Sequence, residues 1–147
     1  MEIVLVIIAT LFGVISADSI GFHISRFLAW RKTELSGKWS SEFEKNGEII
    51  VDHVLLYGSF GGVTWGVVQV SPYKKTHPKP YRIKVVREYK SVYSIVFKPQ
   101  DRSVADIGTG TIVFDHESGI AKGVVVGFDQ GAVEPVIRNI AAQRLSV

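Results

Sequence analysis

An uncharged apolar run near the start of the chain sets the strongest limit on how the chain can fold. Residues 3–16 contain no charged residue and only two hydroxyl side chains. From Leu35 onward, apolar and polar residues alternate as they do in half-buried β-strands. The two parts therefore suit different solvents. We divide the chain into residues 1–34, a transmembrane and juxtamembrane helix, and residues 35–147, a single β-domain.

The apolar run is long enough to span a bilayer when it is extended beyond residue 16. A helix needs about 20 mostly apolar residues to cross a hydrocarbon core of roughly 30 Å. Ile3–Phe22 supplies them. Trp30, beside the basic residues Arg31 and Lys32, has the composition of a membrane–water interface. We therefore expect one membrane-spanning helix that ends at such an interface.

A cleaved secretory signal is the alternative, because Ile15-Ser-Ala17 could serve as a cleavage site. Signal peptides usually begin with positive charge, but the charged side chain before the apolar run is Glu2. The basic residues follow the run, so the positive-inside rule puts the N-terminus outside and the β-domain in the cytoplasm. The absence of cysteine agrees with a reducing compartment.

Small residues at four-residue spacing mark one stripe of the expected helix. Gly13, Ala17 and Gly21 form this stripe. Such a pattern lets two helices approach closely. It predicts self-association, and hence a homo-oligomer.

The β-domain contains eight strand candidates separated by turn residues. Eight antiparallel strands in sequence order fit an up-and-down barrel, whose interior is filled by side chains or holds one small ligand. We therefore predict an all-β, eight-stranded antiparallel barrel preceded by the transmembrane helix. The candidates are Ser36–Glu44, Glu48–Tyr57, Val63–Val70, Tyr81–Tyr89, Ser91–Lys98, Thr109–His116, Ile120–Phe128 and Val133–Leu145.

Alternation assigns residues to the two faces of each strand. Trp39, Ser41 and Phe43 share one face of the first strand. Burial of an unpaired charge is costly, so a barrel with polar inward residues is either a wet binding site or a closed polar network. A register error of one residue would reverse every face. The polar residues that we assign to the interior are His53, Tyr57, Gln69, Arg87 and either Arg138 or Asn139.

A basic stretch interleaved with aromatic residues lies between Ser71 and Pro99. It contains eight lysines and arginines against one acidic residue, Glu88. Positive charge suits phosphates and flat rings suit bases. Anionic lipid headgroups would be attracted as well, and a solvated basic face has the same composition.

Catalytic and metal-binding motifs are missing from the sequence. It has no P-loop, no GxGxxG and no GxSxG motif, and its four histidines do not follow a metal-ligand spacing. We therefore expect a protein that is not an enzyme and uses no cofactor and no metal.

The segment Leu35-Ser-Gly-Lys-Trp39 resembles the Gly-x-Trp opening strand of lipocalin and calycin barrels, in which the tryptophan plugs the barrel floor. With the membrane segment, the basic stretch after it and the lack of cysteine, the whole chain resembles the transmembrane β-barrel effectors of bacterial CBASS anti-phage systems. That family usually carries two transmembrane helices, whereas this chain has one candidate. The resemblance implies that the barrel binds a cyclic dinucleotide from a partner nucleotidyltransferase, and that binding promotes self-association and damage to the inner membrane.

Our first hypothesis is thus a single-pass sensor-effector of the bacterial inner membrane, with its barrel in the cytoplasm. Its expected partners are a cyclic nucleotide second messenger, membrane lipid and further copies of itself, but no nucleic acid polymer. The alternatives are a lipocalin-like carrier of a small apolar ligand, with an uncharged cavity, and a structural membrane-associated barrel with a filled interior. The candidate ligand-binding residues are Tyr57, Trp65, Tyr81, Arg87, Arg138 and Asn139.

Overall fold

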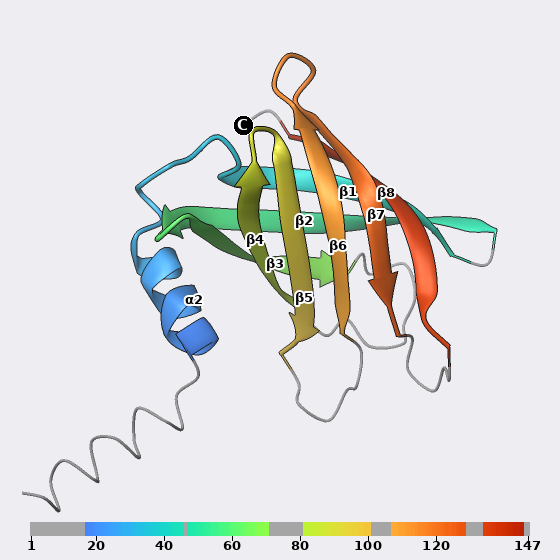
Figure 1. Cartoon of the computed structure of the whole chain (residues 1–147), viewed down its shortest axis with the longest axis horizontal. Coiled ribbons are helices and arrows are strands. Elements are labelled where there is room, and N and C mark those ends of the chain that lie inside the picture. Colours follow the sequence, from blue (N-terminus) through green and yellow to red (C-terminus); the bar gives the residue numbers. More distant parts are fainter. Residues whose placement is uncertain (1–16, 46, 71–80, 101–106, 129–133, 146–147) are drawn as a thin grey trace, which may run out of the picture.

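The computed structural model (Figure 1) describes residues 17–45, 47–70, 81–100, 107–128 and 134–145. Within these residues it has a short helix followed by eight strands. The elements are α2 (Ala17–Phe27), β1 (Gly37–Lys45), β2 (Glu48–Phe60), β3 (Val63–Val70), β4 (Tyr81–Tyr89), β5 (Val92–Pro99), β6 (Gly108–Asp115), β7 (Ile120–Gly127) and β8 (Val136–Arg144).

The strands form a closed antiparallel barrel in sequence order. Each strand pairs with the next along the chain, and β8 pairs back with β1, where Trp39 lies opposite Arg144 and Phe43 opposite Ile140. The all-β class, the strand number and the up-and-down order predicted from the sequence are therefore confirmed.

The turns at one end of the barrel are short because a few residues adopt left-handed backbone conformations. Gly61 and Gly62 have φ values of 61° and 78° between β2 and β3. Lys90 takes the same region, with φ 45°, between β4 and β5. Glycine reaches this region without a steric penalty, whereas a residue with a Cβ does so rarely. These turns reverse the chain within a few residues, so that each strand can pair with the next as a hairpin.

Side chains fill the barrel at this same end, which we call the floor. The indole nitrogen of Trp39 donates a hydrogen bond to the carbonyl of Leu35 at 2.8 Å. The Trp39 ring meets Phe114 edge-on, with 5.6 Å between ring centroids, and the Arg144 guanidinium lies 5.4 Å from the Trp39 ring. Arg144 also donates to the carbonyl of Ser36 at 2.7 Å. The segment that carries the resemblance to lipocalin barrels thus closes the floor.

Helix α2 packs against the outside of the barrel, beside β2 and β3 (Figure 1). Phe22 is buried there, and its ring meets those of Tyr57 and Trp65 edge-on, with centroids 5.9 and 6.4 Å away. The Arg82 guanidinium, from β4, lies 4.5 Å from the Phe22 ring. The apolar stripe of α2 therefore covers an outer wall.

Two glycines allow this close approach. A Cβ at Gly21 would lie 2.9 Å from the indole nitrogen of Trp65. A Cβ at Gly58 would lie 2.3 Å from the carbonyl oxygen of Leu28, which is backbone and cannot swing away. Gly21 is thus used in contact between the helix and its own barrel.

No helix within the described residues is long and apolar enough to cross a membrane. Residues 17–22 of the expected span Ile3–Phe22 belong to α2, where Phe22 is buried against the barrel wall. The rest of the apolar run, residues 3–16, lies outside the described residues. Gly13 of the small-residue stripe lies outside them as well.

The face assignment was wrong for β2. The inward residues are Asp52, Val54 and Leu56, whereas His53 is exposed and Tyr57 contacts the outer helix. β2 is apolar on both faces, so alternation could not separate inside from outside. The structure does not describe the side chain of Gln69 on β3.

Candidate functional site

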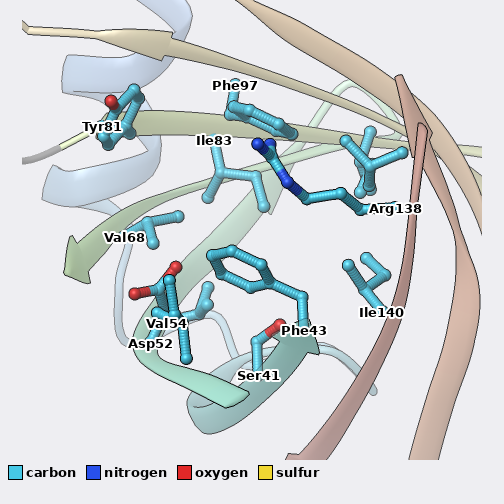
Figure 2. Close-up of a pocket in the computed structure, with 13 residues that line it drawn as sticks. Ser41, Phe43, Asp52, Val54, Val68, Tyr81, Ile83, Phe97, Arg138 and Ile140 are labelled. Atoms are coloured by element: carbon cyan, nitrogen blue, oxygen red, sulfur yellow. The ribbon is translucent and has the colours of Figure 1, made fainter. Parts of the chain in front are cut away.

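The barrel is hollow at the end opposite Trp39. A cavity of about 220 Å³ opens there (Figure 2). Its lining residues come from every strand of the barrel except β6. Nine of the thirteen lining residues are apolar, so most of the cavity wall is hydrophobic. They are Phe43, Ile50, Val54, Val68, Ile83, Ile95, Phe97, Val125 and Ile140.

Four polar residues interrupt this wall: Ser41, Asp52, Tyr81 and Arg138. Ser41 and Asp52 lie opposite each other in the ladder between β1 and β2. Asp52 is only 9% exposed. An ionised carboxylate in a mostly apolar wall can accept hydrogen bonds from the polar groups of a ligand that enters the cavity.

Arg138 and the aromatic rings form the other half of the site. The Arg138 guanidinium lies 5.6 Å from the Phe43 ring. Tyr81 meets Phe97 edge-on, with centroids 6.3 Å apart. Figure 2 shows the Arg138 side chain extending from its strand toward Phe97 and Ile83. A guanidinium beside aromatic faces can hold an anionic or carbonyl group while a flat ring packs against the phenylalanines.

The order of the strands explains how these residues meet. β1 lies between β2 and β8 in the barrel. Ser41 and Phe43, on β1, therefore lie between Asp52 on β2 and Arg138 on β8. In the view of Figure 2 the Asp52 carboxylate and the Arg138 guanidinium are on different sides of the Phe43 ring.

The structure brings together two of the six predicted ligand-binding residues. Tyr81 and Arg138 line the cavity. Tyr57 and Trp65 face α2 on the outer wall, and Asn139 is exposed at a position next to inward-facing Arg138 and Ile140.

Arg87, the remaining candidate, belongs to a charged cluster at the floor. Its guanidinium lies 3.4 Å from the Glu34 carboxylate and donates to the carbonyl of Lys90 at 2.7 Å. The Tyr93 hydroxyl donates to the same Glu34 carboxylate, and His116 Nδ1 lies 3.6 Å from it. Burial and the neighbouring Glu34 carboxylate raise the pKa of Tyr93 to about 12. This cluster ties the segment before β1 to the floor.

The sequence reasoning missed Phe43, Phe97 and Asp52 as site residues. A signal for Phe43 was present, because it shares a strand face with Trp39 and the tryptophan occupies the interior. Pairing β1 with β2 would then have placed Val54, opposite Trp39, and hence Asp52 on the inner side. Phe97 carries no comparable local signal.

Among the described residues, no group of three or more histidine, cysteine, aspartate or glutamate side chains could hold a metal ion. Comparison of the chain with protein-family models, with curated proteins and with solved structures finds no match.

Proposed function

We propose that the protein is a membrane-anchored sensor-effector whose cytoplasmic barrel binds a cyclic dinucleotide. Binding would control oligomerisation and disruption of the bacterial inner membrane in anti-phage defence. The observation that carries this proposal is the joint presence of a guanidinium, aromatic rings and a carboxylate around one cavity. These are Arg138, the rings of Phe43, Tyr81 and Phe97, and Asp52.

The chemistry of a cyclic dinucleotide matches these groups. Its bases stack on flat rings, and the edges of its bases exchange hydrogen bonds with polar and charged side chains. Arg138, already placed against the Phe43 ring, combines charge with stacking. The same site would hold a ligand without any covalent chemistry, as a sensor requires.

The size of the cavity limits how much of the ligand enters. A cavity of about 220 Å³ is small beside the roughly 300–1,000 Å³ of ordinary ligand pockets. That is room for one fused-ring base and not for two nucleotides. One base would therefore enter the barrel, while the rest of the ligand stays at the open end.

The apolar run at 3–16 and the residues after α2 support the membrane anchor. Trp30 is 74% exposed and Phe27 is 82% exposed. Arg31 and Lys32 next to them are exposed as well. Exposed aromatic rings beside basic side chains favour the headgroup region of an anionic bilayer. This segment would then lie against the lipid, as the anchor proposal requires.

A carrier of a small apolar ligand is the second candidate, because nine of the thirteen lining residues are apolar. A cavity of this composition would accept an acyl chain or a flat apolar ring. The polar residues favour the first candidate, since a purely apolar ligand would form no hydrogen bond with Asp52 or Arg138.

Thermal unfolding of the purified full-length chain, in lipid nanodiscs, separates the two candidates. Cyclic dinucleotide at about 100 times its Kd should stabilise the barrel by roughly 2.7 kcal/mol, which raises the melting temperature by several degrees. Stabilisation by a fatty acid, with no response to any of a panel of cyclic di- and trinucleotides, would instead establish the carrier.

A further inference from the structure

The cavity offers one carboxylate and one guanidinium from the two strands on either side of the strand that carries Phe43. Asp52 comes from β2, Arg138 from β8, and Phe43 from the strand between them. Asp52 only accepts hydrogen bonds when ionised, and Arg138 only donates them. A flat base lying against Phe43 would present one edge toward Asp52 and another toward Arg138.

Guanine carries the matching groups on two different edges. Its N1–H and its 2-amino group are adjacent donors, which a carboxylate accepts as a pair. Its O6 and N7 are adjacent acceptors, to which an arginine donates as a pair. One base can therefore satisfy both side chains at once.

Adenine matches the two side chains poorly. Its N1 is an acceptor, so it would set a lone pair against the Asp52 carboxylate. Its N6 amino group is a donor, and it stands where guanine offers O6 to an arginine. Neither edge of adenine therefore offers the paired hydrogen bonds that guanine offers to the carboxylate and the guanidinium.

We propose that the cavity reads guanine, with Asp52 accepting from N1–H and the 2-amino group and Arg138 donating to O6 and N7. This assignment rests on the proposed function and narrows its ligand to a guanine-containing cyclic dinucleotide. Asp52 and Arg138 both have partners within the protein. The base would therefore exchange with existing contacts when it enters.

Calorimetric titration of the full-length chain in nanodiscs tests the assignment. Cyclic di-guanosine monophosphate should bind at least about tenfold more tightly than the adenosine analogue, since a good bidentate pair discriminates by this much or more. The inosine analogue, which lacks the 2-amino group but keeps N1–H, O6 and N7, should bind with intermediate affinity. This comparison changes only the ligand, so it does not depend on any variant folding.

Asp52→Asn provides the test on the protein side. An amide both donates and accepts, and asparagine pairs with the edge of adenine. The variant should lose affinity for the guanine ligand and shift the affinity ratio toward the adenine ligand. Glu42→Gln is the matched control, because Glu42 is exposed on the neighbouring strand and lies outside the cavity. It should leave the ratio unchanged.

The outcomes separate this assignment from the proposed function. If the adenosine analogue binds as tightly as the guanosine one, the guanine assignment fails and the cyclic-dinucleotide sensor stands. If guanosine monophosphate binds as tightly as the cyclic dinucleotide, the guanine pocket stands and the cyclic-dinucleotide sensor fails. If no nucleotide of either kind binds, both are wrong.

Discussion

Tyr93 and Glu34 meet at the floor of the barrel, where a buried hydroxyl donates to a carboxylate that also contacts Arg87 and His116. Tyr93 is 3% exposed. Loss of its proton would leave a phenolate beside a carboxylate in a buried place. This explains why its pKa rises to about 12 from its ordinary value of 10.0.

The raised pKa of Tyr93 predicts alkaline destabilisation. The folded state holds the proton more tightly than the unfolded state, so this stabilisation is complete below pH 10 and is lost as the pH rises through about 12. Two pKa units correspond to roughly 2–3 kcal/mol. Denaturant melts between pH 8 and pH 12 should show the free energies of unfolding of the wild type and of Tyr93→Phe converging as the pH rises. Curves that stay parallel would contradict the prediction.

Two arginines at opposite ends of the barrel give a matched pair of variants. Arg138 lines the cavity, whereas Arg87 belongs to the floor cluster. Arg138→Ala should weaken binding of the cyclic dinucleotide by about 1.5–3 kcal/mol, because a charged hydrogen bond is lost. Arg87→Ala should leave the affinity unchanged and lower only the melting temperature. Calorimetric titration measures both, and equal losses of affinity would show that the cavity is not where the ligand binds.

The residues of the site could be predicted only in part. The alternation of β8 allowed Arg138 as an inward residue, and the structure places it in the cavity. Tyr57 and Trp65 were misplaced because α2 covers the outer wall, so that large aromatic rings are buried on the outside as well. Alternation reports burial, and here burial occurs on both sides of the same sheet.

At the scale of elements, α2 and the segment after it come close to the barrel wall at positions where glycine has no side chain. The carbonyl oxygens of Leu28 and Arg31 lie where a Cβ of residue 58 would be, at 2.3 and 2.9 Å. The segment after α2 therefore runs directly over Gly58. The course of this segment over the barrel wall therefore depends on one glycine in β2, Gly58.

Gly58→Ala should undock the segment after α2. The methyl group would overlap backbone atoms that cannot rotate away, at a cost of about 1–3 kcal/mol for overpacking. Trypsin should then cleave faster after Arg31 and Lys32. Gly127→Ala is the control, since a Cβ there would make ordinary contacts at 3.4 Å. Equal cleavage rates in the two variants would refute the prediction.

The small-residue stripe predicts different effects for its two glycines, because Gly21 contacts the barrel of its own chain. Gly21 faces Trp65 of its own barrel, so Gly21→Leu should disturb α2 docking. Gly13→Leu should weaken crosslinking between copies in the membrane and leave α2 docked, because a bulky side chain keeps neighbouring helices apart. Crosslinking and tryptophan fluorescence of both variants check this. Unchanged crosslinking of Gly13→Leu would show that the stripe does not join copies.

At the scale of the whole molecule, the number and order of the strands followed from the sequence, and their bounds followed to within three residues. Alternating segments are separated by residues such as Gly61, Gly62 and Gly119, whose positive φ values make tight hairpins. Local rules therefore sufficed for the barrel. The docking of α2 could not be predicted in this way, because it depends on contacts between Phe22 and strands far along the chain.

The topology of the anchored protein is the last prediction. Basic residues after the apolar run should keep the barrel on the cytoplasmic side. In intact cells and in spheroplasts, external protease should leave the barrel undigested, and lysis should expose it. Digestion in spheroplasts, or a mature chain that begins near Asp18, would reverse the assigned topology.

The closed ladder of hydrogen bonds has a consequence for how copies can join. β1 pairs with both β2 and β8, so no strand of the barrel presents an unpaired row of backbone groups. An exposed strand edge is the usual template for open-ended stacking of identical chains. If the protein assembles as we propose, its copies would meet through side chains or through their helices, without a shared sheet. Such an assembly would be free to dissociate when the ligand leaves.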